Sequence, residues 1–347
     1  MTRKLLWFLP AAIVAALEMG AIGANCAGVP YHLIREIPIG GEGGWDCLSV
    51  DPAGRRLYVT HGTAVVVIDI DRSQIVGQIA GTPGVHEFAL APLLGRGFSS
   101  NGRENKASIV DLATLQTVAK VDTGQNPDAI LYEPQPKEVY AFNGRSGSAT
   151  VFDAVSGRIV ATIPLPGKPE FAVADPQAQR VFDNIEDKSE VAVIDAQHHQ
   201  VVTAWPTAPG EEPSGLAIDL AYHRLFVGCQ NGRMVMMDSS TGQVLATVPI
   251  GQGVDGSAFD PGTRLAFASC GDGTVTIAKE TSPDSLAVVQ TLTTERGART
   301  MALDPTTHRI YLATAQFAPA PAPKPGAPRQ RPPIVPGSFK VLVYGMD

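Results

Sequence analysis

The chain has 347 residues, of which 44% are hydrophobic and 18% charged, and its formal net charge is −7. Loss of residues 1–27 would remove Arg3, Lys4 and Glu18 and so change this charge to −8. A negative balance of this size opposes binding to phosphate backbones, so no nucleic-acid partner is expected. Length by itself would allow two domains.

Residues 1–27 have the order of an export signal. Arg3 and Lys4 precede the apolar run 5–17, and small residues follow it. The run is too short to cross a bilayer, so we predict a cleaved signal peptide over 1–27. A lipid anchor at Cys26 is one alternative, but residues 22–25 make a poor lipoprotein cleavage site. A retained membrane anchor is another, but Glu18 interrupts the apolar stretch. The mature protein is expected to be periplasmic or secreted, without a membrane span.

Residues 126–167 show the unit that the chain repeats. Four short apolar runs, 129–131, 139–142, 149–152 and 159–163, are separated by Glu-Pro, Asn-Gly and Ser-Gly turn signals. This pattern predicts a four-stranded antiparallel meander. A single meander cannot bury both of its faces, so copies are expected on either side of it.

A turn between the first two strands marks the register of the repeats. It recurs every 40 to 44 residues, at Asp51, Ala91, Glu133, Asp175, Asp219, Asp260 and Asp304. Four strands per copy and this period are typical of a β-propeller blade. The unbroken register predicts one all-β domain over 28–347, a seven-bladed β-propeller of four-stranded antiparallel blades.

The two ends of the repeat array have complementary defects. Residues 31–44 resemble the end of a repeat without its beginning, and the chain stops where the last repeat needs a fourth strand. We therefore predict that residues 33–37 supply the outermost strand of the blade formed by 300–347. This N-terminal strand would close the ring and leave no sheet edge unpaired at the join.

Several strand motifs support a family resemblance. The segments RRLYVTHG (55–62), EVYAFN (138–143) and RIYLAT (309–314) repeat one second-strand pattern, and Val-Ile-Asp recurs in the third strands. The chain resembles the YVTN-type, or YncE-like, exported β-propeller repeat family over residues 31–347. The resemblance implies an exported propeller and says little about function. Blade 6 departs from the pattern, with Lys279 in place of Asp.

One residue in each repeat should reach the top of the central channel. If the strands alternate in direction from the channel outward, the innermost strand of each blade begins at the top of the channel. The residue five positions before each turn is then the one that enters this strand. These positions form a charged ring: Asp46, His86, Asp128, Glu170, Ser214, Asp255 and Arg299. Trp45 is the aromatic residue beside this ring that could stack on a ligand.

The ring has three interpretations. It is a solvated channel entrance, a binding site for a protein partner or a small polar or cationic ligand, or a catalytic site. We favour a non-catalytic binding site, because converging carboxyl groups raise their pKa values unless a cation offsets them. The alternative is a lactonase-like or cyclase-like enzyme with His86 or Glu170 as acid or base and Arg299 holding a carboxylate. No ligand-spacing motif is present, so no metal and no cofactor are predicted, and a monomer is expected.

In the last blade, the loop between the second and third strands expands into a Pro-rich insertion at 316–337. It contains eight prolines and no acidic residue, and its basic residues are Lys324, Arg329 and Arg331. This composition predicts an extended segment. It could cover the acidic ring as a lid, serve as a docking strip, or be an insertion without a role.

The remaining Cys and His residues do not predict a metal site or a disulfide. Cys229 and Cys270 occupy equivalent sites of adjacent blades, where packed sheets stand about 10 Å apart, beyond the ~7 Å Cα separation that a disulfide spans. We predict no intrachain disulfide among Cys26, Cys47, Cys229 and Cys270, and burial of Cys229 and Cys270. His198 and His199 are expected in a solvated turn.

Overall fold

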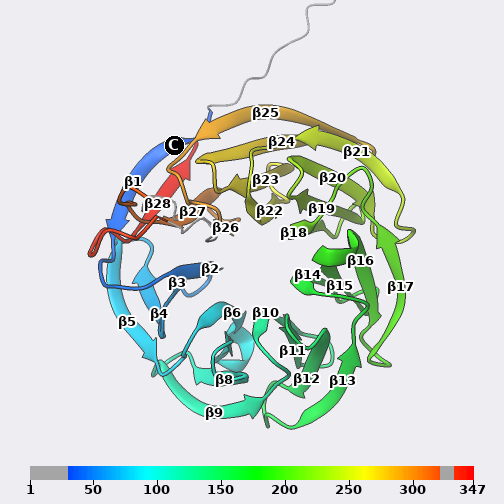
Figure 1. Ribbon diagram of the computed structural model, residues 1–347, viewed down its shortest axis with the longest axis horizontal. Coiled ribbons are helices and arrows are strands. Elements are labelled where there is room, and N and C mark those ends of the chain that lie inside the picture. Colours follow the sequence, from blue (N-terminus) through cyan, green and yellow to red (C-terminus); the bar gives the residue numbers. More distant parts are fainter. Residues whose placement is uncertain (1–29, 321–331) are drawn as a thin grey trace, which may run out of the picture.

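The computed structural model describes residues 30–320 and 332–347. Seven four-stranded antiparallel sheets stand around a central channel, which confirms the predicted seven-bladed β-propeller (Figure 1). The predicted signal 1–27 with Cys26, and Lys324, Arg329 and Arg331 of the insertion, lie outside the described residues. Within the described ranges, no helix has the length and hydropathy needed to cross a membrane.

Blades 1 to 3 are simple meanders whose strands follow one another from the channel outward. Blade 1 contains β2 (Trp45–Asp51), β3 (Arg56–His61), β4 (Ala64–Asp69) and β5 (Gln74–Ala80). Blade 2 contains β6 (Val85–Ala91), β7 (Arg96–Asn101), β8 (Lys106–Asp111) and β9 (Gln116–Asp122). Blade 3 contains β10 (Pro127–Glu133), β11 (Glu138–Asn143), β12 (Ser148–Asp153) and β13 (Ile159–Pro164).

Blades 4 to 6 repeat this order. Blade 4 contains β14 (Pro169–Asp175), β15 (Arg180–Ile185), β16 (Glu190–Asp195) and β17 (Gln200–Pro206). Blade 5 contains β18 (Pro213–Asp219), β19 (Arg224–Cys229), β20 (Arg233–Asp238) and β21 (Val244–Pro249). Blade 6 contains β22 (Val254–Asp260), β23 (Leu265–Cys270), β24 (Thr274–Ser282) and β25 (Ser285–Thr293). Two short 3-10 helices, η1 (Pro92–Leu94) and η2 (Glu186–Lys188), form turns in blades 2 and 4.

Blade 7 joins the two ends of the chain. Its sheet order is β1, β28, β27, β26, and β1 (His32–Pro38) pairs antiparallel with β28 (Lys340–Gly345). The inner strands are β26 (Met301–Asp304) and β27 (Arg309–Thr314). The N-terminal strand therefore supplies the outermost strand of the last blade, as predicted, and closes the ring (Figure 1).

The core lies between neighbouring blades, which explains why the second strands are apolar on both faces. In β11, Val139 and Ala141 pack with Phe98 of blade 2. The intervening residues, Tyr140 and Phe142, pack with blade 4 instead. Successive side chains of a strand point to opposite faces, so each sheet buries one set of side chains against each neighbour.

Blade 6 differs from the others where the sequence departs from the repeat. Its strands β24 and β25 have nine residues each and continue past Lys279 as a longer hairpin. The three described cysteines are unbonded and buried, Cys47 beside the channel and Cys229 and Cys270 within the core.

Ring closure can be tested on β1 alone. Ile37 is 1% exposed and packs in the core between blades 7 and 1, whereas Leu33 on the same strand is 44% exposed. We expect Ile37→Ala to lower the free energy of unfolding by about 2–4 kcal/mol, because it leaves a cavity in the closing interface. Urea unfolding followed by circular dichroism measures this loss.

Leu33→Ala is the matched control, and its expected loss is below about 1 kcal/mol because the side chain is already partly in water. Equal losses for the two variants would contradict a stabilising role for the closing interface.

Candidate functional site

Six of the seven predicted ring residues line one cavity of about 420 Å³ at the mouth of the channel. They come from six different blades: Asp46, His86, Asp128, Glu170, Asp255 and Arg299. The seventh, Ser214, is 2% exposed and donates a hydrogen bond from Oγ to Asp255 Oδ1 at 3.1 Å. The ring register predicted from the sequence thus brings distant parts of the chain to one opening.

A local irregularity in the innermost strands widens the set of residues that reach this cavity. The pairing register of β2 with β3 shifts between Trp45 and Leu48, and β6 shifts between Val85 and Phe88. Such bulges break the strict alternation of side chains. As a result Cys47 and Glu87 line the cavity together with the ring residues that precede them.

Hydrogen bonds between blades hold the backbone of the ring. Thr60 Oγ1 donates to the carbonyl of His86 at 3.1 Å, and Ser100 Oγ donates to that of Asp128. Thr300 Oγ1 donates in the same way to the carbonyl of Asp46 at 2.7 Å. Each bond ties one ring residue to the preceding blade, so ring positions depend on how the blades pack.

The closest group of potential ligand atoms comes from blades 1, 2 and 3. His86 Nδ1 lies 2.7 Å from Asp46 Oδ2 and 3.1 Å from Asp128 Oδ1. One ligand atom from each of Asp46, His86 and Asp128 lies within 4.8 Å of the others. Imidazole nitrogen and carboxylate oxygen are donors for several divalent metal ions, so this set has the chemistry to hold one.

Arg299 belongs to a second group on the other side of the ring. Its Nε bonds to Asp255 Oδ2, and its guanidinium nitrogen NH2 lies 3.8 Å from Asp46 Oδ1. These are the ion pairs expected from the neighbouring positions of blades 6, 7 and 1. Arg299 therefore neutralises part of the carboxylate charge instead of facing an open cavity alone.

Lys168 is a cavity residue that the sequence analysis missed. It lies in the loop before β14, and its Nζ contacts Glu170 Oε1 at 2.5 Å and also Glu186. The only sequence signal was its position two residues before Glu170, within the loop at the channel mouth. Glu170 is consequently paired, not free to act alone on a ligand.

Glu87 was also missed, because strict alternation places it away from the channel. Its Oε2 accepts a hydrogen bond from the backbone N–H of Ile130 at 2.8 Å. Burial raises the pKa of Glu87 to about 8, although that hydrogen bond opposes the shift. Burial likewise raises the pKa of Glu170 to about 8 against the influence of Lys168.

The pKa values of His86 and Asp128 reflect competing influences. For His86, burial lowers the pKa, but the hydrogen bond to Asp46 and the charge of Asp128 outweigh it, so the pKa is raised. Burial raises the pKa of Asp128, and the imidazole of His86 opposes that shift. The cavity therefore exchanges protons near neutral pH, as sites with converging acids commonly do.

Trp45 lies outside this cavity. Its ring stacks on Phe339 with 5.2 Å between centroids and approaches Phe317 at 6.1 Å. It lines a neighbouring groove of about 530 Å³, with Ile334 and Arg299 among the other wall residues. The predicted contact of Trp45 with a ligand stays a prediction, and this groove is where it would occur.

Comparisons with known proteins identify the fold without identifying a family. No protein-family model matches the chain, and no curated protein matches its sequence. A solved chain titled Kuenenia stuttgartiensis hydrazine synthase is similar, with a TM-score of 0.69 and 16% identity over 78% of this chain and 92% of that chain. As 1801 solved chains match, the likeness is to a widely shared architecture. It shows a common β-propeller fold and carries no activity across.

The raised pKa of Glu87 predicts a pH dependence of stability. A glutamate has an ordinary pKa of 4.5, whereas Glu87 keeps its proton to about pH 8 in the folded chain. The folded state therefore binds more protons than the unfolded state between these values, and the free energy of unfolding falls as pH rises from 5 towards 8. Glu87→Gln should reduce this decrease in the free energy of unfolding between pH 5 and 8 by about 1–2 kcal/mol. This figure is smaller than the full pKa difference would give, because water in the cavity screens the carboxyl group.

Urea unfolding at several pH values between 5 and 8 measures the slope. Glu211→Gln, at an exposed loop position, is the control and should follow the wild-type curve. Parallel curves for wild type and Glu87→Gln would show that Glu87 does not hold a proton in the folded chain.

Proposed function

We propose that this chain is an exported, non-catalytic β-propeller that binds a small cation at the mouth of its central channel. The ligand group is Asp46, His86 and Asp128. A divalent metal ion is the first candidate, because these residues offer two carboxylate oxygens and an imidazole nitrogen within 4.8 Å of one another. That juxtaposition is the observation on which the proposal rests.

The charge balance of the cavity supports a cationic ligand. Five carboxyl residues line it, Asp46, Glu87, Asp128, Glu170 and Asp255, against the two permanent cations Lys168 and Arg299. Because the pKa values of Glu87 and Glu170 are raised to about 8, these two add negative charge only as they lose their protons, so the attraction for a cation grows as the pH rises. Lys168 pairs with Glu170, and Arg299 pairs with Asp255. Among the described residues, Asp46 and Asp128 have no permanently charged partner within ion-pair distance except Arg299, which lies 3.8 Å from Asp46.

The shape of the site favours a small ligand over a protein surface. The cavity of about 420 Å³ falls in the size range of small-molecule pockets. A protein partner would meet the rim of the channel and reach these carboxylates only with a protruding side chain.

The proposal also includes export and membership of the YVTN-type family. Export rests on the N-terminal pattern, and family membership rests on the strand motifs.

A lactonase-like or cyclase-like enzyme is the second candidate function. It is favoured by one observation: His86, Glu170 and Arg299 line the same cavity, and the pKa of Glu170 is raised to about 8, a suitable value for acid–base work. Against it, each of the three is held by a different partner, namely Asp46, Lys168 and Asp255.

Calorimetric titration with Ca²⁺, Mn²⁺, Zn²⁺ and methylammonium tests the proposal. We expect one site per chain for at least one divalent ion, reversal by chelator, and at least tenfold weaker binding by Asp128→Asn. Affinity should rise with pH through the raised pKa of His86, because the metal requires the unprotonated imidazole. Release of protons on binding should appear as a dependence of the heat on the buffer.

Asp122→Asn is the control, since this carboxylate lies on the outer strand β9 with 80% of its side chain exposed. It should bind as wild type does. Absence of binding by every cation, or unchanged binding by Asp128→Asn, would overturn the proposal. Hydrolysis of a panel of lactones, lost in Glu170→Gln, would establish the enzyme instead.

A further inference from the structure

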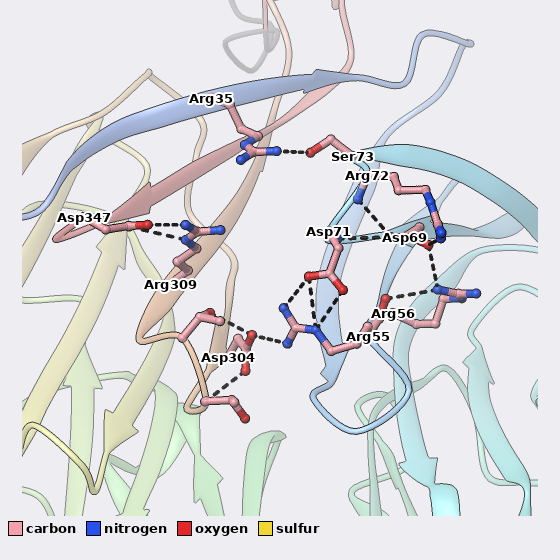
Figure 2. Close-up of polar contacts among 12 residues, drawn as sticks. Arg35, Arg55, Arg56, Asp69, Asp71, Arg72, Ser73, Asp304, Arg309 and Asp347 are labelled. Atoms are coloured by element: carbon pink, nitrogen blue, oxygen red, sulfur yellow. Dashed lines mark hydrogen bonds and ion pairs between the residues drawn. The ribbon is translucent and has the colours of Figure 1, made fainter.

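The bottom face of the propeller carries a repeated contact between neighbouring blades. In every blade except blade 2, which has Ala91, the turn between the first two strands carries an acidic residue. This residue faces the next blade, at the position four residues after that blade's own turn residue. Between blades 7 and 1, Asp304 Oδ2 accepts from Arg55 at 2.7 Å, and Arg55 also contacts Asp71 (Figure 2). Blades 7 and 1 are therefore joined by an ion pair at the bottom face, in addition to the ring closure by β1 and β28.

Three further junctions have a basic residue, Arg or His, in the same place. Asp260 Oδ2 lies 2.7 Å from His308 Nδ1 between blades 6 and 7. The distances are longer at the other two, 3.6 Å from Asp219 to Arg264 and 3.8 Å from Asp175 to His223. Arg and His therefore occupy the same place, and the following blade always supplies the basic residue.

The junction between blades 3 and 4 has the acid without the cation. Glu133 occupies the acidic position, and the facing residue is the neutral Gln179. Glu133 is 0% exposed; its Oε1 accepts from the backbone N–H of Gln135 at 3.1 Å. Its Oε2 is buried with neither a hydrogen-bond nor an ion-pair partner among the described residues. Such an uncompensated acceptor is costly to bury.

A pocket of about 260 Å³ lies at this junction. Glu133, Glu138, Gln179 and His199 are among its wall residues. Glu138 is 8% exposed and accepts from His199 Nε2 at 2.8 Å, so its charge already has a partner. The predicted solvated turn at His198 and His199 thus has one residue directed inward, while His198 pairs with Asp195 at 2.8 Å.

We propose that this pocket is a second binding site, for a guanidinium-bearing ligand that supplies the cation missing between blades 3 and 4. Glu133 Oε2 accepts from the guanidinium, as Asp304 Oδ2 accepts from Arg55. The remaining N–H groups meet the side-chain oxygens of the wall. The site is independent of the channel mouth, since it lies at the opposite end of the blades and uses none of its residues.

A single metal ion fits this pocket less well. Among the described residues, three or more potential ligand atoms from His, Cys, Asp and Glu gather within 4.8 Å only at Asp46, His86 and Asp128. A guanidinium spreads its five donors over a plane, which suits acceptors that are further apart.

The junction between blades 1 and 2 is a contrasting case. Asp51 there faces Gly95, whose Cβ position opens on free space, with no atom within 4 Å. Both Asp51 and Glu133 lack a facing basic residue, but of these two acids only Glu133 has a buried oxygen without a hydrogen-bond partner among the described residues. The argument for a ligand therefore applies to Glu133 alone.

The internal test is to supply the cation from the chain itself. Gln179, Arg55 and Arg264 share a left-handed backbone, with φ of 53°, 53° and 58°, so Gln179→Arg can take the conformation of the natural arginines. We expect this variant to have a raised Tm and to occupy the pocket.

The ligand test follows the His199 ring resonances by NMR during titration of the purified chain with methylguanidinium. Wild type should show a saturable shift, and Gln179→Arg and Glu133→Gln should weaken binding at least tenfold. A capped Gly-Arg-Gly peptide forms a second arm. Equal affinities for methylguanidinium and the peptide would show that the site recognises the guanidinium alone. Tighter binding of the peptide would show that the ligand is an arginine within a polypeptide.

Lys137→Gln is the matched control, because Lys137 has the equivalent position at the junction of blades 2 and 3 but faces Ala91. It should leave the titration unchanged. A His199 resonance that does not respond in wild type, or a titration unaltered in Gln179→Arg, would overturn the proposal. If Glu133→Gln does not fold, Gln179→Arg decides by itself. Cation binding at Asp46, His86 and Asp128 is a separate result and unaffected by this one.

Discussion

The pairing of β1 with β28 is the interaction on which the rest of the molecule depends. A propeller blade buries both of its faces only when it has a neighbour on each side, so an open ring would leave two apolar sheet faces in water. The N-terminal strand completes blade 7 and brings Ile37 into the interface with blade 1. Closure then places seven innermost strands around one channel, which is the condition for a shared site.

Two levels of structure shape that site. The repeat sets one residue per blade at the channel mouth, and hydrogen bonds from residues such as Thr60 and Thr300 hold their carbonyl groups to neighbouring blades. The bulges in the innermost strands then add Glu87 to the same wall. A carboxyl-rich cavity is the outcome, and burial raises the pKa values of Glu87 and Glu170 within it.

The two ends of the channel depart from the repeat in different ways. Most bottom junctions satisfy an acid with a cation from the next blade, and Asp304 with Arg55 is the clearest example. At Glu133 the repeated acid stays and its cation is replaced by Gln179. Conversely, the top positions keep no common residue type, so Arg299 and His86 create two chemically different sides within one ring.

The sequence by itself determined the number of blades, the strand order, the closing strand and six residues of the cavity, including Asp46, His86 and Asp128. These follow from period and alternation, which are local properties of the chain. Only the tertiary structure decided that Glu87 reaches the cavity, that Lys168 pairs with Glu170 and that Trp45 lines another groove. The same holds for Glu133 Oε2, which has no partner among the described residues. Those outcomes depend on bulges, on side-chain pairing within loops and on contacts between blades, which the period and alternation of the sequence do not specify.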